Sequence, residues 1–197
     1  GDLAELRILL AKGADVNQAR TDNGATPLHL AALNGHANVV KLLLEHKDID
    51  PNQMRTNDRF GWTSLYIAAH YGHAGVVQVL LEDTRTDINQ ARTDNGVTPL
   101  IIAAHNGHAN VVELLLAKDA DVNQATTDNG TTPLLIAAEN GHLAVVELLL
   151  ENGADFNQAR TDNGATPLYI AAQEGHEDIV KLLLADKTIN INQACHD

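Results

Sequence analysis

Apolar and polar residues recur along this chain in blocks of about 34 residues, and the same short motifs return in each block. A block opens on Thr-Pro-Leu, as at residues 26–28, where threonine suits a helix cap and proline the first helical position. Leucine and paired alanines follow, and Asn34-Gly35 ends this helix, because glycine adopts a left-handed backbone at low cost. A second helix begins near Ala37, with valines and leucines at helical spacing. The pattern predicts two short helices per block, joined by a tight turn.

The blocks are joined by polar segments such as residues 17–26, which carry Asn-Gly near their middle. Asn-Gly suits a tight turn with positive φ, so these segments are predicted to project as a row of β-hairpin-like fingers. One helix pair cannot bury its apolar residues on both faces, whereas stacked pairs can. We therefore expect an all-α solenoid of stacked helix-turn-helix units. The opening threonines, 37, 35, 34 and 34 residues apart, are Thr26, Thr63, Thr98, Thr132 and Thr166.

This pattern resembles the ankyrin repeat over essentially the whole chain. The resemblance rests on Thr-Pro-Leu-His-Leu-Ala-Ala at 26–32, on Ala-Asp-Val-Asn at 14–17, and on five Gly-His pairs in register. Most units have 34 residues where the family has about 33, with the extra residue in the finger. The histidine that the family places after Thr-Pro-Leu is present as His29 and is replaced elsewhere by Tyr66, Ile101, Leu135 and Tyr169.

We expect one ankyrin repeat domain over residues 1–197. Residues 17–28 and 157–168 are identical, which indicates recent duplication or deliberate averaging, so a natural excerpt and an engineered, consensus-like array are both retained. The chain starts in mid-repeat and stops at the beginning of a finger, and apolar residues lie near both of its ends. End-to-end self-association is therefore the alternative to a mostly monomeric chain. The predicted division is a partial repeat at 1–19, repeats at 20–54, 55–91, 92–125 and 126–159, and a fifth repeat with a finger stub at 160–197.

Composition argues against several partner classes. Lys and Arg number 13 against 26 for Asp and Glu, so the formal charge of −13 disfavours nucleic acid and anionic membranes as partners. The longest apolar runs fall well short of a membrane span. Cys195 is the one cysteine, which excludes an intrachain disulfide and fits a reducing compartment, so we expect a cytoplasmic protein.

The residue types of enzyme active sites are present without the necessary arrangement. Ser64 is the one serine and takes the proline position at a helix start. Cys195 and His196 are neighbours near the end of the chain, which does not hold a nucleophile against a base. The Asp-Asn-Gly turns lack the glycine and glutamate that complete a calcium loop, and no glycine-rich phosphate loop is present. We expect no enzymatic activity and no cofactor.

Two histidine pairs spaced by three residues raise the question of a metal site. They are His70 with His73 and His105 with His108. His73 and His108 belong to the repeated Gly-His pairs, which favours a structural role, and no cysteine or fixed carboxylate completes either pair. We expect neutral structural histidines and no metal.

A partner is expected on the concave surface of fingers and first helices, where residues vary while the frame stays fixed. Four of the six aromatic residues, Phe60, Trp62, Tyr66 and Tyr71, lie in the second repeat, whose longer finger adds Arg59. Tryptophan, tyrosine and arginine are enriched at interface hot spots. The alternative is that Phe60 and Trp62 fill the gap left by the longer loop.

A row of finger arginines is the second candidate feature. It runs through Arg20, Arg55, Arg92 and Arg160 and is interrupted by Thr126. Such a row suits carboxylates on an extended peptide. The alternative is local pairing, because an aspartate lies two residues after three of these arginines. The predicted partner-binding residues are Arg20, Arg55, Arg59, Phe60, Trp62, Tyr66, His70, Tyr71, Arg92, His105, Arg160 and Tyr169.

The function expected from this pattern is that of a non-enzymatic scaffold for protein–protein interaction. The alternative is an engineered or structural array that is selected for stability and has no dedicated partner. The resemblance to ankyrin repeats further implies a substrate role, as a target of asparagine hydroxylation at Asn17, Asn123 and Asn157.

Overall fold

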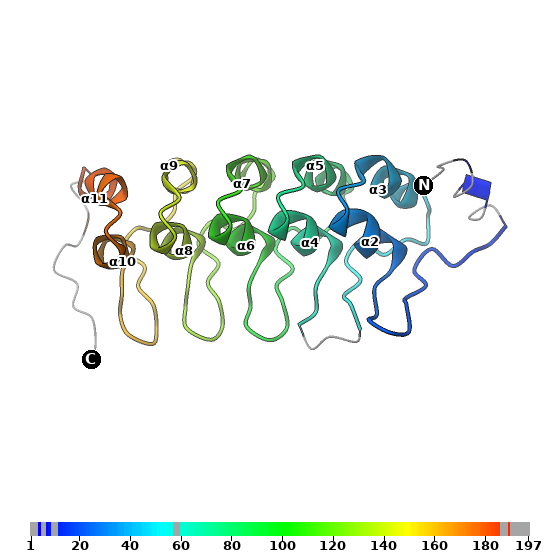
Figure 1. Cartoon of the computed structure of the whole chain (residues 1–197), viewed down its shortest axis with the longest axis horizontal. Helices are drawn as coiled ribbons and strands as arrows, with labels where there is room; N and C mark the ends of the chain where they lie inside the picture. The colour runs from blue at the N-terminus through cyan, green and yellow to red at the C-terminus, as the bar shows by residue number, and fades with distance from the viewer. Residues whose placement is uncertain (1–3, 5–6, 9–11, 57–59, 186–188, 190–197) are drawn as a thin grey trace.

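The structure is a computed structural model that describes residues 4, 7–8, 12–56, 60–185 and 189 (Figure 1). These residues contain ten α-helices in five consecutive pairs and no strand, which confirms the predicted all-α solenoid. The first helices of the pairs are α2 (Pro27–Leu33), α4 (Ser64–His70), α6 (Pro99–His105), α8 (Pro133–Glu139) and α10 (Pro167–Glu174). The second helices are α3 (Ala37–Leu44), α5 (Ala74–Glu82), α7 (Ala109–Leu116), α9 (Leu143–Glu151) and α11 (Glu177–Leu184).

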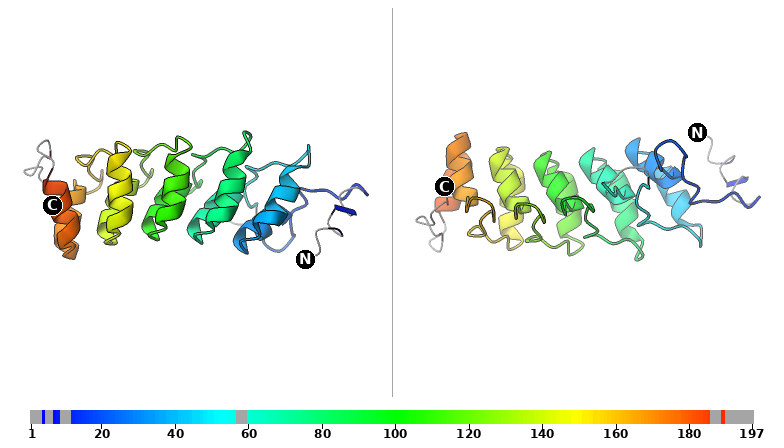
Figure 2. Two further views of the ribbon diagram at one scale, coloured as in Figure 1. Left: turned by 90° about the horizontal axis from the view of Figure 1, so that it is seen from above. Right: turned by 90° about the horizontal axis from the view of Figure 1, so that it is seen from below.

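The helices form two rows, and the fingers project from the row of first helices (Figure 1). Figure 2 shows each row as a series of helices lying side by side along the array. The core runs between the rows over the whole array. In the third pair, Ala103 and Ala104 of α6 and Val112 and Leu115 of α7 are all 0% exposed. Paired alanines leave little side chain between neighbouring first helices, so the helices pack closely without large aromatic residues.

Each first helix begins as its sequence predicts. A threonine in extended conformation is the N-cap, and its hydroxyl accepts the backbone N–H three residues on, as Thr26 does from His29. In α2 the bond is reciprocated, because the backbone N–H of Thr26 donates to Nδ1 of His29 over 3.1 Å. The other four helices keep the threonine cap without a histidine at this position. Loss of the family histidine therefore removes the reciprocal bond and leaves the cap intact.

The Gly-His pairs join each repeat to the next. The glycine has a positive φ, +72° at Gly107, and the histidine ring of the following repeat lies against it. A Cβ on Gly107 would lie 2.7 Å from the ring of His142. Four glycines each lie against a histidine of the next repeat, and we call these four pairs the Gly–His seam. The pairs are Gly35 with His73, Gly72 with His108, Gly107 with His142 and Gly141 with His176. The Nε2 atoms of its histidines donate over 2.9–3.1 Å to carbonyl oxygens of the preceding repeat, from His73 to Leu33, His108 to His70, His142 to His105 and His176 to Glu139.

Asparagine side chains make a second set of links at the bases of the fingers. Nδ2 of Asn123 donates to the carbonyl of Gly153 over 3.2 Å, and Oδ1 of Asn123 accepts the N–H of Asp155 over 2.8 Å. Asn17 and Asn52 make the same pair of bonds to the repeats that follow them. Both polar atoms of the amide are therefore used to hold adjacent finger bases together.

The described fingers are closed by tight turns and contain no assigned strand. In the third finger, the N–H of Arg92 donates to Val97 and the N–H of Gly96 donates to Arg92, which closes a tight turn without paired strands. The fingers instead bond to one another, as Thr127 N–H does to the carbonyl of Asn95 over 2.9 Å. Asn-Gly correctly placed the turn, and the two arms of each finger lead to helices of successive repeats.

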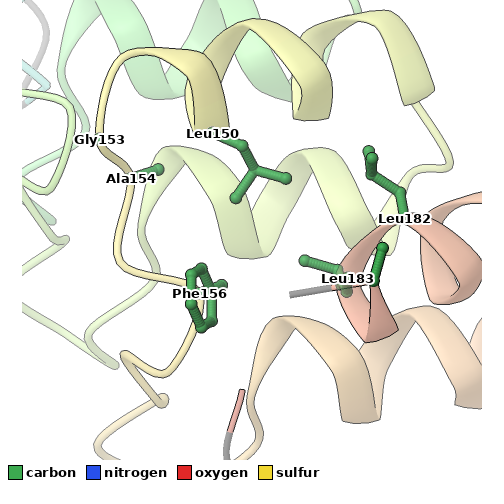
Figure 3. Close-up of a pocket in the computed structure, with 7 residues that line it drawn as sticks. Leu150, Gly153, Ala154, Phe156, Leu182 and Leu183 are labelled. Atoms are coloured by element: carbon green, nitrogen blue, oxygen red, sulfur yellow. The ribbon is translucent and has the colours of Figure 1, made fainter. Parts of the chain in front are cut away.

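The two ends of the array carry exposed apolar side chains. Ile8 is 54% exposed and Leu184 is 50% exposed, whereas Ile179 and Leu183 are buried. Leu150 and Phe156 face α11 across an apolar hollow of about 450 Å³ (Figure 3). The other apolar residues expected at the first end, Leu3, Leu6, Leu9 and Leu10, lie outside the described residues.

Candidate partner-binding surface

The fingers and the first helices enclose a surface that we call the finger groove. Two hollows formed by described residues lie in it. One, of about 180 Å³, lies between the first two repeats and includes Leu33, Trp62 and Tyr71 in its lining. The other, of about 250 Å³, lies further along, where Ile101 of α6 and Ile136 of α8 contribute to its floor. Positions that differ from repeat to repeat line both hollows.

The aromatic residues of the second repeat are packed under an arginine of the third. The guanidinium carbon of Arg92 lies 4.8, 5.9 and 5.8 Å from the ring centroids of Phe60, Trp62 and Tyr66. Tyr66 is 2% exposed and Trp62 is half-buried, while Phe60 is 37% exposed. Burial by itself raises the pKa of Tyr66, an effect that the positive charge of Arg92 partly offsets. The cluster therefore fills the space beside the longer finger and leaves the Phe60 ring as its accessible part.

His70 connects this cluster to the open part of the groove. Its ring stacks on Tyr66 at 6.4 Å and meets the edge of Tyr71 at 4.7 Å, and Tyr71 is 47% exposed. Nδ1 of His70 is buried without a hydrogen-bond partner. Burial lowers the pKa of His70, and the charges of His105, His108 and Arg92 lower it further. His70 is therefore a neutral packing group below an exposed tyrosine.

The arginine row is largely neutralised by its own fingers. Arg20, Arg92 and Arg160 each place Nη2 at 2.6 Å from the aspartate two residues on, which is the predicted local pairing. The hydrogen bonds from Arg20 and Arg160 are the main causes that lower the pKa of Asp22 and Asp162. Arg55 differs from the others, because its guanidinium lies 5.8 Å from the Trp62 ring and donates to the carbonyl of Asn23.

Five members of the predicted set are exposed among the described residues. Tyr71 and Tyr169 are 47% and 48% exposed, and Arg20, Phe60 and His105 are also exposed, His105 beside the larger hollow. Tyr66 is buried, so its contribution is to the packing beneath the surface. Arg59 lies outside the described residues.

The fourth finger interrupts the arginine row, because Thr126 stands where the other fingers carry an arginine. Thr126 turns inward, where its hydroxyl donates to Oδ1 of Asn129 over 2.8 Å and accepts the N–H of Thr131 over 3.0 Å. Asp128, two residues on, is exposed and lines the larger hollow. An aspartate retained without its arginine was the sign, visible in the sequence, that this finger differs.

The described part of the chain holds neither a metal cluster nor a membrane-spanning helix. Residues placed there bring together no group of three or more His, Cys, Asp or Glu side chains that could hold a metal. The Nε2 atoms of His73 and His108 are instead bonded to carbonyl oxygens, while Cys195 and His196 lie outside this part. Over the same described residues, the helices are too short and too polar to cross a bilayer.

Comparison with known proteins agrees with the repeat architecture. The chain is similar to a 2-5A-dependent ribonuclease from Mus musculus, with 42% identity over 57 residues, which is 29% of this chain and 8% of that protein. A family model that describes three consecutive ankyrin repeats matches this chain over four overlapping ranges, residues 1–92, 51–126, 85–160 and 123–195. These matches extend over nearly the whole sequence, and the chain therefore belongs to the ankyrin repeat family.

Proposed function

We propose that this chain is a non-enzymatic scaffold that binds a polypeptide partner in the finger groove. Ankyrin repeats generally mediate protein–protein interaction. The observation that carries the proposal is a contrast between neighbouring positions. The Gly–His seam is repeated without change, whereas the groove positions seven residues after each capping threonine are Leu33, His70, His105, Glu139 and Gln173.

Exposed side chains in the groove are of the kind that anchor interfaces. Tyr71 and Tyr169 lie about half exposed at separate points along the row of first helices. Tyrosine offers a large contact area with little conformational entropy to lose and a hydroxyl for hydrogen bonding. An extended segment or a loop that crosses several repeats would meet both residues, with the fingers on one side and the first helices on the other.

The test is a selection of short random peptides displayed on phage, carried out with the folded chain as bait. The groove variant carries Tyr71→Ser and Tyr169→Ser, and the matched control carries Glu113→Ala and Glu147→Ala on exposed positions of second helices. Selected peptides should bind the control like the original chain and lose at least about tenfold in affinity on the groove variant. Equal binding to all three proteins would place the partner elsewhere and overturn the proposal.

The alternative is a structural or engineered array without a dedicated partner. The identity of residues 17–28 and 157–168 favours it, because two copies of a finger show no sign of having diverged to meet different parts of a partner. This alternative predicts that repeated rounds of selection enrich no sequence above the level found with an empty support.

A further inference from the structure

The fourth finger lacks the arginine that neutralises the aspartate in three other fingers. In those fingers, Arg20, Arg92 and Arg160 hold the aspartate in a fork, with Nε to Oδ1 at 2.9–3.0 Å and Nη2 to Oδ2 at 2.6 Å. In the fourth finger Thr126 takes the place of the arginine, and its side chain is turned into the finger and 9% exposed. The position that a guanidinium occupies in the other fingers is therefore not filled from within this finger.

Asp128 keeps the corresponding place of the aspartate. Its Oδ1 accepts the backbone N–H of Asn129 over 2.8 Å, and no Lys or Arg among the described residues forms an ion pair with it. Its side chain is exposed, so the carboxylate remains hydrated and open to an incoming cation. An exposed carboxylate alone does not make a binding site, but Asp128 also lines a hollow of the groove.

Asp128 lies on the rim of the larger hollow of the finger groove. This hollow has a volume of about 250 Å³ and an apolar lining that includes Val97, Ile101 and Ile136. It is below the range of about 300–1,000 Å³ that is usual for pockets binding small molecules. A slot of this size, with apolar walls and one acidic rim, suits a single long side chain with an apolar stem and a cationic head.

We propose that this hollow is a docking subsite for an arginine side chain of a polypeptide partner. The aliphatic stem lies on Val97, Ile101 and Ile136, and the guanidinium forks onto the carboxylate of Asp128. The partner thereby supplies the arginine that the fourth finger lacks, in the geometry that the first, third and fifth fingers make internally. This inference rests on the proposed scaffold function and assigns it one specific contact.

The charges around the hollow favour a cation there. Arg92, which also lines the hollow, is already held by Asp94 at 2.6 Å and packs over three aromatic rings. The pKa of Arg160 is raised chiefly by its hydrogen bond with Asp162, and the charges of Glu139 and Asp128 add to the effect. Arg160 is therefore within electrostatic reach of Asp128, but it is held by Asp162 at 2.6 Å and forms no ion pair with Asp128. The formal charge of −13 also attracts basic segments at long range. Lysine would fit less well, because its single ammonium cannot reproduce the two-point fork.

Thr126→Arg is the decisive variant, because it converts the fourth finger into the form of the other three. The new arginine should pair with Asp128 and occupy the hollow, so thermal stability should be unchanged or higher. The charge-matched control is Asn110→Arg, which adds the same charge at an exposed position on α7. Asp128→Asn removes the proposed partner charge without changing the shape of the side chain.

The measurement is fluorescence anisotropy with a labelled arginine peptide taken from the phage selection. Its dissociation constant should rise at least about tenfold on Thr126→Arg and on Asp128→Asn, and stay within about twofold on Asn110→Arg. Replacing the peptide arginine by citrulline, which keeps the shape and removes the charge, should cause a similar loss on the original chain. The effect should also weaken with added salt.

The possible outcomes separate this inference from the function on which it rests. Peptides that depend on Tyr71 and Tyr169 but bind the Thr126→Arg variant unchanged would overturn the arginine subsite and leave the scaffold function standing. Enrichment of sequences without arginine would do the same. A selection that enriches nothing would overturn both proposals.

Discussion

The Gly–His seam and the finger groove run along the same array of repeats, but residues are identical from repeat to repeat in the seam and vary in the groove. In the seam, every glycine meets a histidine of the next repeat, and every such histidine donates to a backbone carbonyl. In the groove, equivalent positions range from leucine to glutamate. The difference separates two roles: unchanging residues hold the repeats together, and under the proposed scaffold function the changing residues determine what is bound.

The same contrast appears inside the groove, between the second and fourth fingers. The second is filled by its own aromatic residues and by Arg92 from the third. In the fourth finger, the Thr126 side chain bonds to Asn129 within the turn, and a hollow lies beside Asp128. Fingers built on one frame can therefore be closed or open according to one or two side chains. Substitutions in the seam should change stability, and substitutions in the groove should change binding.

The largest effect on stability is expected in the seam, for Gly107→Ala. The new Cβ would lie 2.7 Å from the His142 ring, and the backbone φ of +72° is unfavourable for alanine. Together these costs amount to about 3 kcal/mol of unfolding free energy, measurable by urea denaturation. Gly175→Ala is the matched control, because its φ is +78° and nothing lies within 4 Å of the added Cβ. It should lose only about 1 kcal/mol, and equal losses would refute the role given to the histidine.

A smaller loss is expected at the finger bases, for Asn123→Ala. This change removes the bonds to Gly153 and Asp155 and leaves the backbone groups to be satisfied by water. Two partly exposed hydrogen bonds correspond to about 1–2 kcal/mol of unfolding free energy. The control is Asn140→Ala, whose amide bonds only to Ile136 in its own helix and is exposed. If the control were as destabilising as the test variant, the links between repeats would not be the cause.

His70 should make stability depend on pH in a predictable direction. Its pKa in the folded chain is lowered from the usual 6.5, so below about pH 6.5 the unfolded chain binds a proton more readily. Stability is therefore complete above this value and falls as the pH decreases towards the folded pKa. Urea midpoints at pH 7.5 and 5.5 measure the effect. His70→Leu, which adopts the residue of the first repeat at this position, should lose less stability over the same interval.

Features that repeat within the chain could be predicted from the sequence, because each copy corroborates the others. The threonine caps, the glycine turns and the structural role of the Gly-His histidines are of this kind. Asn-Gly specifies a turn but not what its arms bond to, and here the N–H of Thr127 bonds to the neighbouring finger.

The contacts of single residues across repeats were harder to predict. Clustering in the sequence identified the aromatic residues of the second repeat, but Arg92, which covers them, lies more than twenty residues further on. The hollow beside Asp128 is open because threonine replaces arginine at position 126 and because the Thr126 hydroxyl turns inward to Asn129. Periodicity carries no information about such positions, because they are the places where the repeats differ.

The smallest effect on stability is expected where the effect on binding should be largest. Tyr71→Ala and Tyr169→Ala each remove an exposed ring that is about half accessible to solvent. Surface changes of this type alter unfolding free energy by within about 0.5 kcal/mol, so the urea midpoint should hardly move. Tyr71 also meets the His70 ring at 4.7 Å and stacks on His73 at 6.1 Å, so the loss of these two contacts sets the upper limit at this position. A loss comparable with that of Gly107→Ala would show that the groove tyrosines hold the frame together, and the separation of roles between seam and groove would fail.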